Sequence, residues 1–186
     1  KVNYKISVAD PEDGTTGAGI SCDDVKVDVA LGHDEHSHTL SSTTGCTGTL
    51  NTGLTSGHGA EANTFTVLGV SYTDKGSGGA PALTGRAQAI LQPKTKQAEF
   101  FASTGRVPDG GTNGDAGVTK ETTTDTAGGG QNIGFIEDGD YVSFKPYNLE
   151  NTTAMRFRVA SAGAGGTIEV RLDSPTGTLV GTTANI

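Results

Sequence analysis

The sequence contains no tryptophan, one methionine and few aromatic residues, which make up 5% of its 186 residues. It also lacks the apolar spacing of helices, because glycine or threonine interrupts nearly every window in which positions i, i+3, i+4 and i+7 would be apolar. Glycine is abundant instead, with 29 residues, alongside many threonine, serine, valine and aspartate residues. This composition favours short strands joined by turns, so we predict an all-β protein.

Long hydrophobic runs and an excess of basic residues are both missing. No apolar run approaches the roughly 20 residues needed to cross a bilayer, and no signal segment precedes Lys1, so we expect a soluble chain that is either mature or a fragment. The 13 lysines and arginines are scattered, and the formal net charge is -8. Such a field repels phosphate backbones and anionic lipids, so we expect no nucleic-acid partner and no membrane span.

Cysteine is scarce as well, with only Cys22 and Cys46. A bridge between them would close a loop of about 25 residues and stabilise the fold by about 3 kcal/mol in the chain-entropy model. We predict this disulfide, and with it a secreted, extracellular protein. The alternative, two buried thiols in a cytosolic protein, fits the rest of the composition less well.

Alternating apolar and polar residues predict two β-sandwich domains in tandem, at residues 1–93 and 94–186. Short strands separated by glycine-rich turns make the first domain Ig-like or fibronectin-like and the second a jelly roll. The clearest strands are expected at residues 25–31, 65–72 and 86–91 in the first domain, and at residues 97–101, 133–136, 141–144, 155–160, 167–172 and 178–180 in the second.

Three motifs of the second half resemble family 6 carbohydrate-binding modules. They are Gln-Ala-Glu at residues 97–99, Gly-Phe-Ile-Glu-Asp-Gly-Asp-Tyr-Val-Ser-Phe at 134–144, and Gly-Thr-Ile-Glu-Val-Arg-Leu-Asp-Ser-Pro-Thr-Gly at 166–177. The resemblance implies a jelly roll in a secreted protein, a glycan or polysaccharide as partner, and a structural calcium ion.

The resemblance also assigns roles to single residues. Gln97 and Glu99 would be calcium ligands that share one face of the first strand, since amide and carboxylate oxygens suit Ca²⁺. Phe135 would stack on a sugar ring in a cleft among the loops. Tyr141 would line a second cleft. The alternatives are that Glu99 is a solvated edge residue and that Tyr141 belongs to the sandwich core.

A family 6 module normally continues beyond the point at which this sequence ends, and it then supplies further strands and a tryptophan for the sugar cleft. We therefore expect the sandwich of residues 94–186 to be incomplete. Either the chain is a fragment of a longer polypeptide that contains the missing strands and further domains, or copies of the chain supply these strands by strand addition. The second possibility makes a structural subunit of an extracellular fibre the alternative function.

The first half resembles an Ig-like region that precedes family 6 modules in large secreted bacterial multidomain proteins, and it contains all four histidines. In an extended segment His36 and His38 would point to the same side, and with His33 nearby they would offer imidazole nitrogens to Zn²⁺ or Cu²⁺. The alternative is a polar, histidine-rich hairpin loop whose imidazoles meet water.

Catalytic motifs are absent from the sequence. It contains no nucleophile elbow, no P-loop and no His-Glu-x-x-His, and its glycine clusters do not open helices. We therefore predict a protein that is not an enzyme: a carbohydrate-binding second domain preceded by a spacer.

Overall fold

The computed structural model describes residues 1–52, 57–59, 61–107, 117–163 and 165–186. The chain divides into two compact units, one comprising Lys1–Gln97 with Thr124–Gly130 and the other Ala98–Thr123 with Gln131–Ile186. Strands and short 3₁₀ turns are the only regular elements among the described residues, so the prediction of an all-β protein is confirmed. No helix in this part of the chain has the length and apolar character that crossing a membrane requires.

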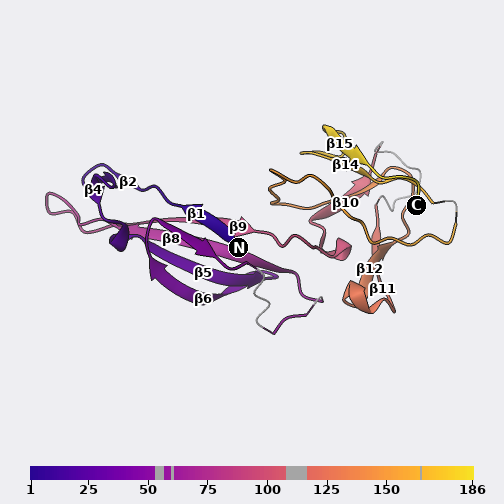
Figure 1. The fold of residues 1–186 in the computed structure, drawn as a ribbon, viewed down its shortest axis with the longest axis horizontal. Coiled ribbons are helices and arrows are strands. Elements are labelled where there is room, and N and C mark those ends of the chain that lie inside the picture. Colours follow the sequence, from indigo (N-terminus) through magenta and orange to yellow (C-terminus); the bar gives the residue numbers. More distant parts are fainter. Residues whose placement is uncertain (53–56, 60, 108–116, 164) are drawn as a thin grey trace. The chain divides into compact units, whose positions relative to one another are not determined.

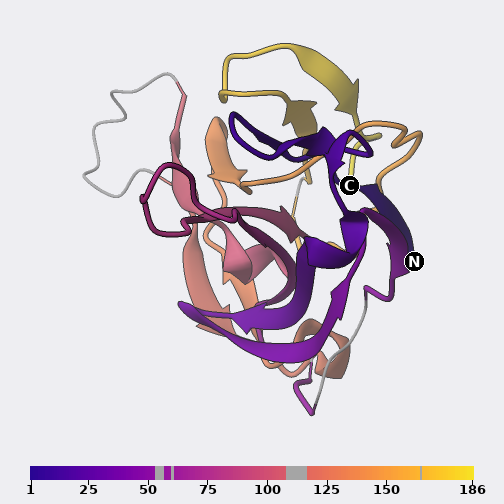
Figure 2. The same ribbon diagram turned by 90° about the vertical axis from the view of Figure 1, so that its left-hand side faces the viewer.

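The first unit is built on a four-stranded antiparallel sheet with the order β6-β5-β8-β9 (Figure 1). Valine alternates along β5, which is why this strand lies inside the sheet with its apolar residues buried. The sheet has a pronounced twist (Figure 2). Its strands are β5 (Lys26–His33), β6 (His36–Thr44), β8 (Thr64–Thr73) and β9 (Thr84–Leu91).

A second layer covers the apolar face of this sheet. β1 (Val2–Lys5) pairs antiparallel with β7 (Thr47–Leu50), and Leu50 packs on Val27, Val29 and Leu68 of the sheet. The remaining short strands form a small sheet at one end of the unit, next to a core cluster around Val25 and Tyr72. They are β2 (Ala9–Asp10), β3 (Gly14–Thr16) and β4 (Gly19–Ile20).

The predicted disulfide joins Cys22, in the 3₁₀ turn η1 (Cys22–Asp24), to Cys46, just before β7. The two Cα atoms are 5.1 Å apart. Cys46 belongs to the same buried cluster as Val25, so the bridge ties the edge of the second layer to the core. The prediction of a Cys22–Cys46 bridge is confirmed.

The second unit consists of three separate antiparallel pairs, β10 with β13, β11 with β12, and β14 with β15. The prediction of a strand is wrong for two segments. Residues 97–101 form the 3₁₀ turn η2 (Ala98–Phe100) instead of a strand, and residues 155–160 form no strand although their apolar residues alternate. Its strands are β10 (Ser103–Arg106), β11 (Thr119–Thr122), β12 (Gln131–Gly134), β13 (Asp140–Ser143), β14 (Glu169–Arg171) and β15 (Leu179–Thr182). The 3₁₀ turn η3 (Thr126–Gly128) belongs to the first unit.

Candidate functional site

Phe135 stands out in the loop that directly follows β12. Phe135 is 77% exposed, more than any other large apolar residue in the described part of the chain. The neighbouring Ile136 is 63% exposed. The backbone of Phe135 has φ of 55°, in the left-handed region that bulky residues rarely adopt. A strained backbone that presents an aromatic ring to water persists only where surrounding contacts hold it, and such strain is concentrated at functional sites.

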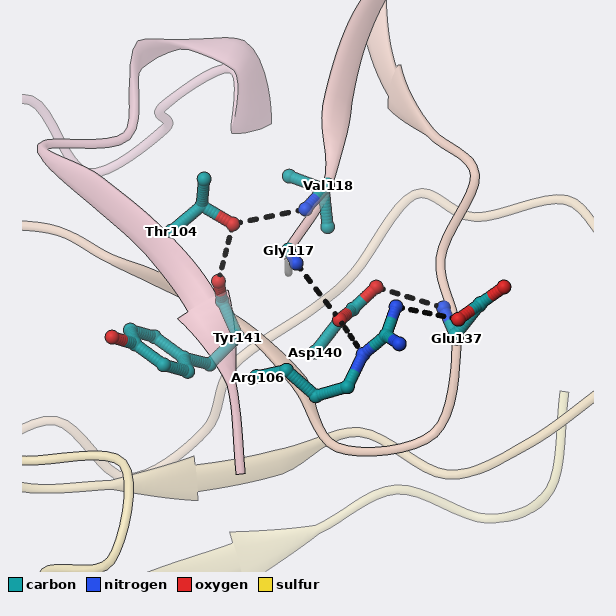
Figure 3. A network of polar contacts seen from close by, with 7 residues as sticks. All are labelled: Thr104, Arg106, Gly117, Val118, Glu137, Asp140 and Tyr141. Carbon is teal, nitrogen blue, oxygen red and sulfur yellow. Dashed lines mark hydrogen bonds and ion pairs between the residues drawn. The ribbon is translucent and has the colours of Figure 1, made fainter. Parts of the chain in front are cut away.

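The loop that follows Phe135 is held by Asp140, the first residue of β13, whose side chain has no exposed surface (Figure 3). One carboxylate oxygen accepts from the Arg106 guanidinium at 2.8 Å and from the Gly117 backbone N–H at 3.1 Å. The other accepts from the Glu137 backbone N–H at 2.9 Å. Arg106 also forms an ion pair with the Glu137 carboxylate. One buried carboxylate thus fastens three chain segments around the Phe135 loop.

The electrostatics keep this network charged. Burial of Asp140 opposes ionisation, but the Arg106 hydrogen bond and the backbone N–H groups outweigh it and hold the pKa of Asp140 below its ordinary value. The hydrogen bond to Asp140 in turn raises the pKa of Arg106. Both groups are therefore ionised at neutral pH, and the loop between β12 and β13 is fixed before any ligand arrives.

Tyr141 follows Asp140 but is only half exposed, and its ring lies against the neighbouring strand β10. A Cβ atom placed on Gly105, its cross-strand partner, would be 2.8 Å from the Tyr141 hydroxyl oxygen, so the ring covers this glycine. The Thr104 hydroxyl donates to the Tyr141 carbonyl and accepts from the Val118 N–H (Figure 3). Among the described residues, no other aromatic ring contacts either Tyr141 or Phe135.

The predicted calcium ligands do not share a strand face, because η2 replaces the expected strand. Gln97 donates its side-chain N–H to the Ala127 carbonyl at 3.0 Å, which leaves its amide oxygen as an acceptor. Glu99 is only 2% exposed, and no ion pair within the described ranges involves it. A buried carboxylate without a cationic partner is the kind of group that a metal ion stabilises.

A comparison with protein families finds a match in the second half of the chain. The family model described as carbohydrate binding module (family 6) matches residues 112–185. Residues 112–185 are therefore similar to a family 6 carbohydrate-binding module. No solved structure matches the chain. The resemblance based on the motifs is thereby confirmed, whereas the Ig-like assignment of the region before the family 6 module stays a prediction.

The predicted histidine ligands, which lie outside the family 6 module, do come together. His33 and His36 are cross-strand partners at the end of the β5–β6 hairpin, and His38 lies on the same side. Nε2 of His33 is 3.2 Å from Nε2 of His38. His58 joins them, with its ring centroid 4.4 Å from that of His33.

Sequence reasoning missed two features of these sites. It gave Glu137 and Arg106 no role in a site, because Arg106 is distant in the sequence from Glu137 and from Asp140, its two partners. It also left His58 outside the proposed ligand set. The one available signal for the network was the Glu-Asp-Gly-Asp turn at residues 137–140. Asp140 accepts a hydrogen bond within this turn, and a buried carboxylate needs further partners.

Proposed function

We propose that the chain is a non-catalytic, secreted segment that binds a glycan or polysaccharide through the loop carrying Phe135. The supporting observation is the 77% exposure of this ring on a left-handed backbone, two residues before the Glu137 N–H that binds the buried Asp140 carboxylate. An aromatic face can stack on the C–H face of a sugar ring. The exposed carboxylates of Glu137 and Asp138 lie in the same turn, where they can accept hydrogen bonds from sugar hydroxyls.

Calorimetric titration of the full chain with a panel of soluble plant, fungal and bacterial oligosaccharides tests this proposal. We expect Phe135→Ala to weaken binding about tenfold or more, since stacking and burial of the ring are lost. Phe157→Ala is the matched control, because Phe157 is also exposed, at 42%, but lies outside the loop. Equal losses in both variants, or no binding of any sugar by the wild type, would refute the assignment.

We also propose a structural calcium ion, with Glu99 as a ligand and Gln97 as the further ligand that the family resemblance implies. The burial of Glu99 without a basic partner in the described chain supports this ion, whose role would be to neutralise the carboxylate and fix the turn η2. Adding Ca²⁺ should raise the melting temperature of the wild type but not that of Glu99→Gln. A rise of the same size in both proteins would remove Glu99 from the site.

In this proposal the first unit acts as a spacer that carries the binding module in an extracellular protein. The Cys22–Cys46 bridge supports an oxidising compartment. Secretion can be tested by expressing the chain with and without export to the periplasm and counting free thiols by mass spectrometry. Efficient folding of the thiol form in the cytosol, without loss of stability, would argue against an extracellular origin.

A second candidate is a structural subunit of an extracellular fibre. Its support is a row of exposed apolar side chains at alternate positions, Met155, Phe157 and Val159, in a segment that has no strand partner among the described residues. Such a row is suited to pairing with an added strand. Light scattering after size exclusion would reveal concentration-dependent assembly that Val159→Lys abolishes. A monomer at all concentrations would eliminate this candidate.

A further inference from the structure

The end of the β5–β6 hairpin gathers imidazoles onto one face. His33 and His36 are directly opposite each other, and His38 is two residues beyond His36, so the three side chains project to the same side. Leu31, the partner of His38, is 2% exposed, so this is the face that forms the core of the first unit. The histidines continue the core face at its open end, where the side chain of His33 is still only 13% exposed.

The spacing of these imidazoles matches shared coordination of one ion. Zinc binds histidine nitrogens at about 2.0–2.1 Å, which places two tetrahedral ligand atoms about 3.3 Å apart. The Nε2 atoms of His33 and His38 are 3.2 Å apart, and one ligand atom from each of the three histidines lies within 4.8 Å of the others. The ring centroids of His36 and His38 are 4.9 Å apart, and those of His33 and His38 are 5.3 Å apart. A hydrogen-bonded hairpin therefore holds the ligands before an ion binds.

The surroundings of His33 complete this arrangement. Its other ring nitrogen, Nδ1, is 3.3 Å from a carboxylate oxygen of Asp34, the contact that fixes the tautomer and orientation of a metal-binding imidazole. The ring of His58 packs against His33 from outside the hairpin. Imidazole nitrogens, with no carboxylate bound directly to the ion, suit Zn²⁺ or Cu²⁺ and disfavour Ca²⁺ or Mg²⁺.

We propose that His33, His36 and His38 bind one transition-metal ion of the zinc and copper class, with Asp34 orienting His33. The ion would join the two strands next to their turn. This site lies in the first unit and is independent of glycan binding and of the calcium ion.

The test is a titration of the full chain, stripped of transition metals, with Zn²⁺ as the only transition metal added. Excess Ca²⁺ is present throughout. We expect one ion per chain, and about tenfold or greater weakening in His38→Ala, because a ligand is lost. Ser37→Ala is the matched control, since Ser37 lies between two ligands on the same strand but on the opposite face. Equal affinity in wild type and His38→Ala would overturn the proposal.

X-ray absorption of zinc bound to the wild type provides a second test that depends on no variant. Nitrogen neighbours at about 2.0–2.1 Å with imidazole scattering are expected. A shell of oxygen atoms alone would place the zinc at carboxylates elsewhere and overturn the proposal, whether or not His38→Ala folds.

Discussion

The two units of the chain are stabilised by different means. The first unit contains ten of the eleven buried apolar residues of the described chain, and only Val118 belongs to the second. A continuous four-stranded sheet, a second layer and a disulfide hold the first unit together. The second unit consists of separate strand pairs, and the Asp140 network links the β10–β13 pair to the segments at Gly117 and Glu137. Apolar burial stabilises the unit that we propose to be a spacer, while polar contacts fix the loop that we propose binds sugar.

Removing the disulfide should produce the largest effect, and only in the first unit. The double variant Cys22→Ala, Cys46→Ala should lower the free energy of unfolding of that unit by about 3 kcal/mol, since the unfolded chain regains the freedom of the closed loop. Hydrogen exchange followed by mass spectrometry should show faster exchange in β5 and β8. Equally faster exchange in β10 and β13 would show that the two units are not stabilised separately.

Breaking the polar network should have a somewhat smaller effect, confined to the second unit. Asp140→Asn removes the negative charge but keeps the shape, so Arg106 loses its buried partner, and we expect a loss of about 2 kcal/mol in unfolding free energy. Asp138 is an exposed neighbour in the same turn, so Asp138→Asn is the control and should change the free energy of unfolding little. If Asp140→Asn also leaves sugar binding intact, the network is not needed to position Phe135.

Much of the first unit was predictable from sequence because its strands are half buried. The alternation of valines identified β5, and apolar runs identified β8 and β9. The expected strands did not include β6, whose nine residues are all exposed, because an edge strand of serine, threonine and histidine has no apolar period. The disulfide followed from the count of cysteines.

The second unit was less predictable because its contacts depend on distant partners. The alternation of Met155, Phe157 and Val159 indicates a strand, but a strand exists only where another chain segment pairs with it, and the period does not identify that segment. The Asp140 network joins residues 106, 117 and 137, whose proximity no local pattern encodes. Family motifs identified the Phe135 loop, but its backbone strain is visible only in the structure.

Acid should affect the Asp140 network before it disrupts the apolar contacts of the first unit. The folded pKa of Asp140 is below the ordinary value of about 3.9, so its stabilising contribution is complete above that pH and is lost as the pH falls through the folded pKa. Unfolding of the wild type should therefore become easier below about pH 4. The Asp140→Asn variant has no carboxyl group at this position. Hydrogen exchange in its β10 and β13 should therefore depend less on pH than in the wild type. Parallel pH profiles would assign acid sensitivity to other carboxylates.

The smallest expected effect is at the alkaline end and concerns the first unit. The hydroxyl of buried Tyr72 donates to the Asp13 carboxylate at 2.6 Å, and this bond raises the pKa of Tyr72 to about 12. Since the pKa of an unfolded tyrosine is about 10, the stabilisation is complete below about pH 10 and is lost as the pH rises toward the folded pKa. Tyr72→Phe should be slightly less stable at neutral pH, and the gap to wild type should close above pH about 10. If chemical denaturation shows no gap at neutral pH, packing of the Tyr72 ring, which Phe retains, and not the hydrogen bond to Asp13 contributes the stability.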